Sequence, residues 1–468
     1  MNKNGKRIVI LGAGIAGLAT AWKILRSNPE YQVTLIERDL IPGGLAKSVS
    51  WKGCPLDLGP HRFHTEIPEI KEFVRTFCEE RMSLVKRASR MYLNGSYIPY
   101  PISMLPTFRA LGLSMTISFA LSALSVFFNR SSNPQSYEDY VKGYYGDSLY
   151  RALFKPFAEK VWGIPAEQIT AETARVRLRG ESIWHALKDN LFSSGETYVS
   201  QFLYPPGGIG DIPQQFAQEV MKMGGDILVR HNAAQIQIEN DEVVGIYADG
   251  PQGTVELPCD LLVTTIPLQD LTTMFYPQPS ADVLQEASEL KFRALTLLYL
   301  QYEEEVGFDD TWLYFPEEHV PFSRIYSPDN FAPHRRQAGK SFLCVEFPCA
   351  VGSKEWRQSS NELARIADDL VVGSGLVKSR SVDSMAIRIK EGYPLYKIGY
   401  EEHLCNTLNY LSSFRNCLST GREGLFRHNN LDQSIQMGLL AGEYILNNDD
   451  CDAWYESTSQ FNDYRIID

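Results

Sequence analysis

The apolar and polar positions of the first forty residues follow the pattern of a strand, a helix and a second strand. Residues 7–11 form a short apolar run, and residues 15–22 continue with the spacing of an apolar-faced helix. Residues 32–36 are again strand-like, and Glu37 follows them directly. This order predicts a β–α–β unit within a parallel sheet, and therefore an α/β fold.

Further patterned segments occur in the middle and at the end of the chain. Residues 261–267 read as a buried strand that returns to the parallel sheet, and residues 434–446 have helical periodicity. Residues 451–468 are polar and are expected to form a tail. Three short, alternating, turn-bounded runs predict a small separate sheet: residues 224–230, 235–239 and 243–247.

The turn between the first strand and the helix carries glycines in the spacing Gly-x-Gly-x-x-Gly. The first permits a tight turn, the second lets the main chain approach a pyrophosphate, and the third lets the helix pack closely on the strand. The helix N-terminus offers free N–H groups to phosphates. For the glycines taken alone, a chance spacing or a structural turn is the alternative. The strand, the helix, the second strand and the acid stand in register with them, and together they predict a dinucleotide site. Its contacts would be Gly12, Gly14, Ile15, Ala16 and Gly17, with Glu37 on the ribose hydroxyls.

A second glycine pair, Gly43 and Gly44, follows the second strand. The pair would let another main-chain segment lie against the cofactor and open a short helix near its phosphates. An ordinary Pro-Gly-Gly turn is the alternative. Flavoproteins often have this second approach and nicotinamide enzymes rarely do, so the predicted cofactor is FAD. Arg38 and Leu45, beside the glycine pair, are further candidate contacts.

These motifs resemble the FAD-binding entry of the FAD-dependent amine oxidase and protoporphyrinogen oxidase-like superfamily, which includes the UDP-galactopyranose mutases. Residues 56–65, Leu-Asp-Leu-Gly-Pro-His-Arg-Phe-His-Thr, resemble the family segment that passes beside the flavin ring. Residues 204–210 resemble the turn that precedes the second cofactor-domain segment. Residues 421–435 resemble the element that closes over the flavin, whose helix dipole would stabilise negative charge on the reduced ring.

The resemblance assigns further cofactor contacts. The main chain of Ala234 would meet the adenine. The segment beside the flavin would contribute Gly59, Pro60, His61 and Arg62, and the closing element would contribute Gly421, Arg422, Asn430, Leu431 and Ser434.

His61 and Arg62 are the candidate catalytic residues, because the resemblance places them nearest to the flavin. A histidine titrates near neutrality and could move the proton that accompanies hydride transfer. Arg62 could stabilise the reduced flavin or an anionic substrate. For each histidine the alternative is a structural hydrogen bond that holds the loop, and this alternative is favoured for His64.

A group of arginines stands at alternate positions, Arg175, Arg177 and Arg179. All three would share one face of a strand, whereas only the first and last share a face of a helix. An arginine pair on one face suits a diphosphate, and a solvated face paired with nearby glutamates is the alternative. By resemblance to the mutases, Arg324 would face a sugar-nucleotide diphosphate. The candidate substrate-binding residues are Trp162, Arg179, Tyr204, Arg324, Tyr393 and His428.

Two features weaken the mutase interpretation. In the mutases the closing element carries a tyrosine that contacts the diphosphate, followed by an acid, where this chain has His428 and Asn430. The extended Pro-Pro-Gly-Gly turn at residues 205–208 is closer to the oxidases. These departures count against ring contraction, but not against FAD binding or an anionic substrate.

The resemblance implies an α/β fold with two interleaved domains. One would be a Rossmann-like FAD-binding domain of the glutathione-reductase-like kind, and the other an α+β substrate domain. The FAD-binding domain would comprise residues 1–84, 202–267 and 401–450. The substrate-binding domain would comprise residues 85–201 and 268–400, with residues 451–468 as the polar tail.

Composition removes several classes of function. The chain has 468 residues, with 45 Lys and Arg against 57 Asp and Glu, and its net charge of −12 argues against a nucleic-acid surface. The eight cysteines are dispersed, without a C-x-x-C pair. This fits neither a zinc site nor a disulfide framework, so we expect no metal and a reducing, cytoplasmic environment.

Two segments bear on location. The first residues lack the apolar core of a signal peptide. Residues 110–128 carry no charge and are about long enough to span a bilayer, although serines and threonines dilute them. A buried or surface-lying helix is the favoured interpretation, and a peripheral membrane contact stays open.

Three enzyme hypotheses follow. The leading one is an FAD-dependent oxidoreductase that acts on a nucleotide-linked sugar or another anionic small molecule by hydride transfer to flavin N5. The second is a redox-neutral mutase of a UDP-sugar. The third is an isoprenoid or porphyrin desaturase at a membrane surface, and a non-catalytic flavin-binding protein is the remaining alternative.

Overall fold

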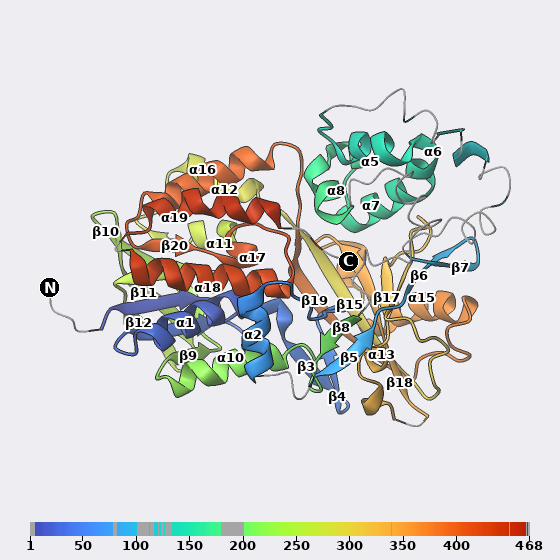
Figure 1. Cartoon of the computed structure of the whole chain (residues 1–468), viewed down its shortest axis with the longest axis horizontal. Coiled ribbons are helices and arrows are strands. Elements are labelled where there is room, and N and C mark those ends of the chain that lie inside the picture. Colours follow the sequence, from blue (N-terminus) through green and yellow to red (C-terminus); the bar gives the residue numbers. More distant parts are fainter. Residues whose placement is uncertain are drawn as a thin grey trace. The chain divides into compact units, whose positions relative to one another are not determined.

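The computed structural model describes residues 5–77, 82–100, 133–178, 201–337, 339–448, 450–464 and 466, with residues 112, 117–119, 121, 122 and 126. The chain divides into two compact units, each assembled from separated stretches (Figure 1). The first unit comprises Met1–Met82, Pro205–Lys291 and Gly399–Tyr464. The second comprises Ser83–Tyr204, Phe292–Ile398 and Arg465–Asp468.

The first unit is built on a parallel five-stranded sheet in the order β20-β13-β1-β2-β9. The middle strand β1 is buried along almost its whole length, as expected for a parallel sheet covered on both faces. The sheet strands are β1 (Arg7–Leu11), β2 (Gln32–Glu37), β9 (Asp226–Val229), β13 (Leu261–Thr264) and β20 (Cys417–Ser419). The predicted β–α–β unit and the returning strand are therefore confirmed.

Helices and smaller elements complete the first unit. They are α1 (Ile15–Ser27), η1 (Gly44–Ala46), β3 (Ser48–Trp51), β4 (Cys54–Asp57), α2 (Pro68–Phe77), α10 (Asp211–Lys222), α11 (Leu268–Thr272), α12 (Ala281–Glu289), α16 (Tyr400–Ser412), α17 (Gly421–Gly424), α18 (Leu431–Asn447), α19 (Asp452–Ser457) and η6 (Thr458–Asp463). Residues 268–291, expected in the substrate domain, lie in this unit, because α11 and α12 follow β13 before the chain crosses over.

Helices α1 and α18 pack against each other at short range (Figure 1). A Cβ atom on Gly438 would lie 2.2 Å from the carbonyl oxygen of Ala16, so the helix backbones meet where α18 lacks a side chain. The Thr20 hydroxyl donates to the Gly438 carbonyl at 3.0 Å. This close approach fixes α18 next to the helix that follows the glycine motif.

The small second sheet of this unit has the order β12-β11-β10-β14. Its strands are β10 (Asn232–Glu239), β11 (Glu242–Gly250), β12 (Gly253–Pro258) and β14 (Phe275–Tyr276). The runs 235–239 and 243–247 are strands of this sheet, as predicted. The prediction for 224–230 is wrong, because β9 pairs in parallel with β2 in the main sheet. A short alternating run specifies a strand but not the sheet that it joins.

The prediction that residues 451–468 form a polar tail is wrong. Residues 452–463 form α19 and η6, in which Trp454 and Phe461 are buried. The Trp454 indole N–H donates to the Ser419 carbonyl at 2.8 Å. A few apolar residues among polar ones are enough to hold this segment in the first unit.

The second unit is built on a mixed seven-stranded sheet in the order β19-β15-β18-β17-β16-β6-β7. Its strands are β6 (Ser89–Leu93), β7 (Ser96–Pro99), β15 (Phe292–Tyr302), β16 (Trp312–Tyr314), β17 (Arg324–Tyr326), β18 (Ser341–Cys349) and β19 (Asp383–Pro394), and β5 (Ser83–Lys86) pairs separately with β8 (Gln201–Tyr204). A largely aliphatic and aromatic core lies on this sheet and on helix α15 (Ser360–Gly373).

The helices of the second unit include a compact group with its own apolar cluster. This group consists of α5 (Tyr137–Tyr145), α6 (Asp147–Leu149), η3 (Tyr150–Phe154), α7 (Lys155–Trp162), η4 (Ala166–Gln168) and α8 (Ala171–Arg177). The remaining helices are α13 (Pro328–Phe331), η5 (Pro333–Arg335), α14 (Lys354–Arg357) and α15 (Ser360–Gly373).

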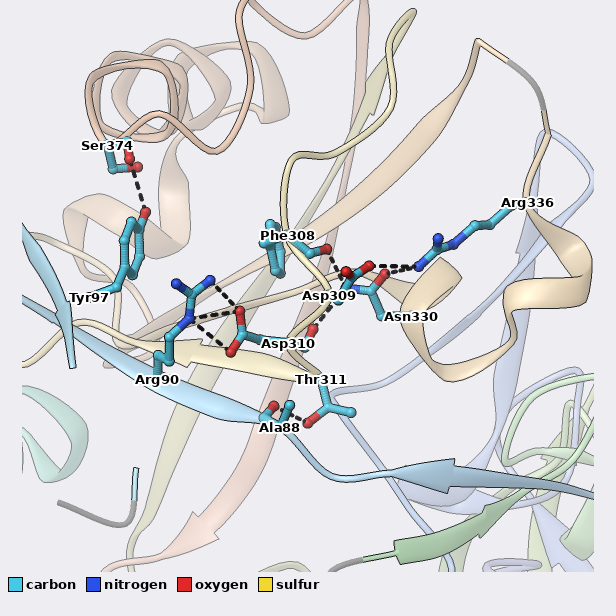
Figure 2. Close-up of polar contacts among 10 residues, drawn as sticks. All are labelled: Ala88, Arg90, Tyr97, Phe308, Asp309, Asp310, Thr311, Asn330, Arg336 and Ser374. Carbon is cyan, nitrogen blue, oxygen red and sulfur yellow. Dashed lines mark hydrogen bonds and ion pairs between the residues drawn. The ribbon is translucent and has the colours of Figure 1, made fainter. Parts of the chain in front are cut away.

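A polar network fixes the start of β16 (Figure 2). The Arg90 guanidinium donates to both carboxylate oxygens of Asp310, with Nε at 3.0 Å from each. The Asn330 amide donates to the carbonyls of Phe308 and Asp310 at 3.0 and 2.8 Å. These contacts hold the residues that lead into β16 against β6 and α13.

Removal of the buried carboxylate should loosen this network. Asp310→Ala leaves the Arg90 guanidinium without its counter-charge. Because Arg90 is about a third exposed, we expect a loss of about 2 kcal/mol in the free energy of unfolding rather than the full cost of breaking a buried pair. Urea denaturation measures it. The matched control is the neighbouring Asp309→Ala, which removes an exposed carboxylate and should change stability by less than about 0.5 kcal/mol. Equal effects would contradict this account.

The uncharged segment 110–128 lies largely outside the described residues. In the parts of the chain that the structure does describe, no helix has both the length and the apolar character needed to cross a membrane.

Candidate functional site

The glycine turn after β1 is built from close main-chain contacts. Gly12 has φ of +94° and donates its N–H to the Ile36 carbonyl at 2.9 Å. A Cβ on Gly17 would lie 2.2 Å from the Gly12 carbonyl oxygen, so only glycine lets α1 begin here. Gly14 is the N-cap of α1 and supplies no side-chain cap. The first-turn N–H groups of Ile15, Ala16 and Gly17 therefore have no acceptor within the helix.

The second glycine pair lies directly against the first motif. The Gly43 N–H donates to the Ala13 carbonyl at 2.8 Å, and Gly14 and Gly43 form an isolated parallel bridge. A Cβ on Gly44 would lie 3.1 Å from the Gly14 Cα. Gly44 also begins the short helix η1, which contains Leu45. Two glycine backbones thus approach each other at the N-terminus of α1, where the sequence predicts a dinucleotide phosphate site.

Glu37 ends β2 as a buried carboxylate with 7% exposure. Its Oε2 accepts the Ala13 N–H at 3.0 Å, and its Oε1 accepts the Asp39 N–H at 2.9 Å. Burial raises the pKa of Glu37, and the Asp39 and Ala13 N–H groups oppose that rise. The main chain orients both oxygens, and each retains a lone pair that could accept a ribose hydroxyl. Arg38 is exposed beside it.

Ala234 lies at an irregularity of strand β10. Its neighbours Ala233 and Gln235 pair with Ala248 and Tyr247 of β11, and the register shifts between them. Ala234 is therefore the extra residue of a β-bulge, and it is exposed. Its main-chain groups are left out of the β10–β11 ladder, which suits the predicted contact with a base.

The segment predicted to lie beside the flavin begins at a buried carboxylate. Asp57 accepts the Ser48 hydroxyl at 2.5 Å and the Ile209 N–H at 3.0 Å. The Ser48 hydroxyl in turn accepts the Gly210 N–H at 2.8 Å. This ties β3 and β4 to the start of the Pro-Pro-Gly-Gly-Ile-Gly turn, so two of the sequence motifs share one polar contact.

The rest of this segment is a tight turn with half-buried side chains. Gly59 has φ of +115°, and its carbonyl accepts the His61 N–H at 2.8 Å. Pro60, His61 and Arg62 are each half-buried. His64 is also half-buried, and burial lowers its pKa, with Glu66 opposing that shift. His64 Nε2 lies 4.0 Å from a Glu66 carboxylate oxygen, and the structural hydrogen bond favoured for this residue stays a prediction.

The closing element is anchored on α1. Gly421 has φ of +81°, and its Cβ would lie 2.8 Å from the Ala16 Cβ. The Arg422 guanidinium donates to the Asn429 carbonyl at 2.8 Å, and the Ser434 hydroxyl donates to the Asn429 side chain at 3.1 Å. His428 is half-buried between α17 and α18.

Asn430 is the N-cap of α18, and it forms a reciprocal capping box with Gln433. The side chain that stands where the mutases have an acid is therefore engaged by the helix itself. Leu431 is the first residue of the helix. The next residue, Asp432, is a carboxylate that the sequence interpretation passed over. Burial raises the pKa of Asp432, whereas main-chain N–H groups, the Thr65 hydroxyl and the Arg62 charge oppose the rise.

The first unit fits an FAD molecule by its donor set. The turn at Gly12–Gly17 leaves free N–H groups and no side chain where a pyrophosphate would bind, Glu37 has oriented oxygens, and Ala234 has unladdered main chain. The residues predicted for the cofactor lie in this one unit.

In the second unit, two predicted substrate residues meet at an arginine. Trp162 and Tyr393 lie with ring centroids 5.9 Å apart in an edge-to-face arrangement. The Arg177 guanidinium carbon lies 5.3 Å from the Trp162 ring and 5.6 Å from the Tyr393 ring. Trp162 is buried, with 3% exposure, whereas Arg177 and Tyr393 are half-buried. We call these three residues the cation–aromatic cluster.

Arg324 lies close to this cluster, because its charge interacts with Tyr393 and with Tyr314. Its Nε and Nη2 donate to the Glu346 carboxylate at 2.8 and 3.1 Å. Burial opposes the charge of Arg324, but Glu346, only 2% exposed, holds its pKa well above its usual range. The Nη1 group of Arg324 takes no part in this ion pair.

The other predicted substrate residues are distributed differently. Tyr204 is buried, packs on Phe331 at 5.2 Å between ring centroids, and lies under the Arg335 guanidinium. Arg175 is exposed on helix α8, 4.0 Å from Glu172. Arg179 lies outside the described residues. Because α8 is a helix that ends at Arg177, the alternating arginines do not form one strand face.

The sequence groups Arg177 with two other arginines but does not single it out as a candidate site residue. No sequence pattern assigns a role in the site to Glu346 or Asp432. Their partners are distant along the chain, so spacing gave no direct signal. Within the described parts of the chain, no group of three His, Cys, Asp or Glu side chains could hold a metal ion.

Comparison with known proteins agrees with this geometry. The family model described as flavin containing amine oxidoreductase matches residues 15–369. The chloroplastic protoporphyrinogen oxidase of Oryza sativa subsp. japonica is 22% identical over 97% of this chain and 88% of its own length. A probable UDP-galactopyranose mutase of Klebsiella pneumoniae is 28% identical over 36% of this chain and 44% of its own length.

Solved structures share the fold. Reduced UDP-galactopyranose mutase aligns with a TM-score of 0.81 and 20% identity over 94% of both chains. A putative protoporphyrinogen oxidase from Exiguobacterium sp. aligns with a TM-score of 0.72 and 17% identity over 95% of this chain and 99% of that one. The predicted α/β class with a Rossmann-like core is confirmed, and FAD is the cofactor of this enzyme. The chain belongs to the flavin containing amine oxidoreductase family.

Proposed function

We propose that this flavoenzyme is an oxidoreductase whose substrate is an anionic small molecule, and that a nucleotide-linked sugar is the first candidate. The observation that carries the proposal is the cation–aromatic cluster of Arg177, Trp162 and Tyr393 beside Arg324. Aromatic faces suit a nucleobase, and guanidinium groups suit a diphosphate.

The first unit would hold the cofactor through the glycine turn, Glu37, Ala234 and the closing element. Bound FAD supplies an acceptor for a hydride from a substrate carbon. The N-terminus of α18 would favour negative charge at its end of the cofactor. The carboxylate of Asp432, in the first turn of α18, would work against that effect when it is ionised.

The second unit would bind and orient the substrate. A diphosphate could receive hydrogen bonds from the Nη1 group of Arg324 and from Arg177, while Glu346 keeps Arg324 in a fixed direction. A base could lie against the exposed part of Tyr393.

His61 would accept the proton that leaves with the hydride, because an imidazole titrates near neutrality. Arg62 would stabilise an anionic substrate.

A redox-neutral sugar-nucleotide mutase is the second candidate. The aromatic and basic residues that it needs, Trp162, Tyr393 and Arg324, come together in one unit, and reduced UDP-galactopyranose mutase shares the fold. Against it, Asn430 replaces the acid of the closing element and serves as a helix cap.

Anaerobic mixing with a panel of anionic substrates tests the proposal. An oxidoreductase should bleach the oxidised flavin when mixed with its nucleotide sugar, and should form hydrogen peroxide in air if oxygen is its acceptor. A mutase should instead need chemically reduced flavin and return an isomerised sugar without net oxidation. If no nucleotide sugar causes either bleaching or isomerisation, the sugar proposal is overturned. Bleaching by a non-sugar anion such as a porphyrinogen would redirect the proposal to that substrate.

A further inference from the structure

Lys160 is a half-buried lysine that links helix α7 to a loop of the second unit. It lies on α7, two residues before Trp162. Its ammonium donates to the carbonyls of Phe315, Glu317 and Phe322 at 2.7, 2.6 and 3.3 Å. These carbonyls belong to the connection between β16 and β17, residues 315–323, which we call the β16–β17 connection.

The second end of this connection leads into Arg324, a predicted substrate residue, and the first end follows Tyr314. Tyr314 ends β16, and Arg324 begins β17. The two are directly paired across the strands. On the helix side, Phe157 of α7 lies edge-to-face with Tyr314 at 5.8 Å between centroids. Lys160 therefore joins the helix that ends in Trp162 to the hairpin that carries Arg324.

A second cation holds the last turn of the same helix. The Arg293 guanidinium of β15 donates to the carbonyls of Val161 and Lys160 at 3.1 and 3.3 Å, and to the carbonyl of Pro348 at 3.1 Å. Gly163 ends the helix with φ of +72°, and a Cβ there would lie 2.4 Å from Arg293 Nη1. The end of α7 is thus fixed to β15. Arg293 of this strand pairs with Tyr393 of the neighbouring strand β19.

We propose that Lys160 is a positioning residue for the substrate, and that its ammonium holds Trp162 in register with Arg177, Tyr393 and Arg324. This inference rests on the proposed function, since it assigns a role in the same anionic site. An ammonium is suited to the task because it supplies three donors, one for each carbonyl of the connection.

The same geometry gives the positioning a pH dependence. Burial lowers the pKa of Lys160 to about 7, and Glu317 and Glu318 of the connection oppose that shift. Arg293, from β15, binds the Lys160 carbonyl rather than its amine. Above pH 7 the neutral amine keeps only two N–H donors for three carbonyls, so one contact is lost. The cluster should loosen as the pH rises.

The experiment uses the FAD-loaded full chain and two readouts. The first is the fluorescence of Trp162, obtained as the difference between each protein and its Trp162→Phe counterpart. The second is the Kd for UDP-galactose, whose diphosphate does not titrate between pH 6 and 9 because both of its ends are esterified. Lys155→Met is the matched control, since Lys155 is a more exposed lysine of the same helix that contacts Glu159.

We expect the wild-type Trp162 emission to change with a midpoint near pH 7. Lys160→Met should show an altered emission at every pH and a Kd for UDP-galactose raised about tenfold at pH 6. Lys160→Arg keeps its charge and should lose the pH dependence. FAD content should stay unchanged in all variants, because the cofactor residues lie in the other unit.

Trp162 emission that is independent of pH in the wild type and unchanged in Lys160→Met would overturn the inference. An effect of Lys155→Met equal to that of Lys160→Met would also overturn it. If wild-type protein fails to bind UDP-galactose while Trp162 responds as described, the sugar proposal fails and the positioning role stands.

Discussion

A Gly14→Ala variant is expected to fold normally and to purify with little flavin. Gly14 has φ of −68°, which alanine adopts freely, and the new Cβ would lie 3.8 Å from the Gly44 Cα, an ordinary contact. The methyl group would instead occupy the approach to the free N–H groups of α1. Loss of one or two charge-assisted hydrogen bonds should weaken FAD binding about 100-fold. The flavin absorbance of purified protein and an FAD titration of the apoprotein measure the effect.

Two other glycines separate loss of the site from loss of the fold. Gly17→Ala would place a Cβ 2.2 Å from the Gly12 carbonyl oxygen, so it should lower both flavin content and thermal stability. Gly143→Ala lies in helix α5 with nothing within 4 Å of the new Cβ and should keep full flavin. Wild-type flavin content in Gly14→Ala would show that the pyrophosphate does not bind at this turn.

Glu346→Ala should be among the most destabilising single changes in the second unit. Glu346 is 2% exposed and receives both hydrogen bonds of the Arg324 fork. Without the carboxylate, the Arg324 charge is left largely buried and uncompensated, which costs about 3–5 kcal/mol. Urea denaturation, followed by circular dichroism, should show a transition at markedly lower urea concentration.

The double variant Arg324→Met and Glu346→Met provides the control for this prediction. Because it removes both charges, it should be more stable than Glu346→Ala. It should also lose affinity for an anionic substrate, since Arg324 is absent. If the double variant is less stable than Glu346→Ala, charge compensation is not the main role of Glu346.

The parts of the site that sequence could predict are those encoded in short segments. Gly12, Gly14 and Gly17 lie within a single turn, in which a Cβ on Gly17 would meet the Gly12 carbonyl oxygen, and their spacing specifies the main-chain geometry. Glu37 was predictable because it ends the strand that pairs with β1. The main-chain geometry of the turn agrees with the predicted motif, whereas the contacts of these residues to the cofactor stay predictions.

Other residues of the site depend on contacts between distant segments. Arg177 reaches Tyr393, and Lys160 reaches the carbonyl of Phe315, through folding of the second unit. No local pattern records these pairings. The alternating arginines were ambiguous for the same reason, because a run of that length fits a strand or a helix until its neighbours are known.

The helical C-terminal segment shows a different limit. Residues 451–468 are polar on average, but Trp454 and Phe461 bury their rings in the first unit. Average polarity therefore concealed two anchoring residues. A predicted tail with isolated aromatic residues is better treated as a candidate packed segment.

The most direct test of an anionic substrate site in the second unit is calorimetric titration of the FAD-loaded protein with UDP-galactose. We predict saturable binding by the wild type that weakens with added salt, as expected for contacts to charged groups. Arg177→Met should raise the Kd about tenfold or more, without loss of flavin. Absence of saturable binding by the wild type, or equal affinity in the wild type and Arg177→Met, would contradict the proposed site.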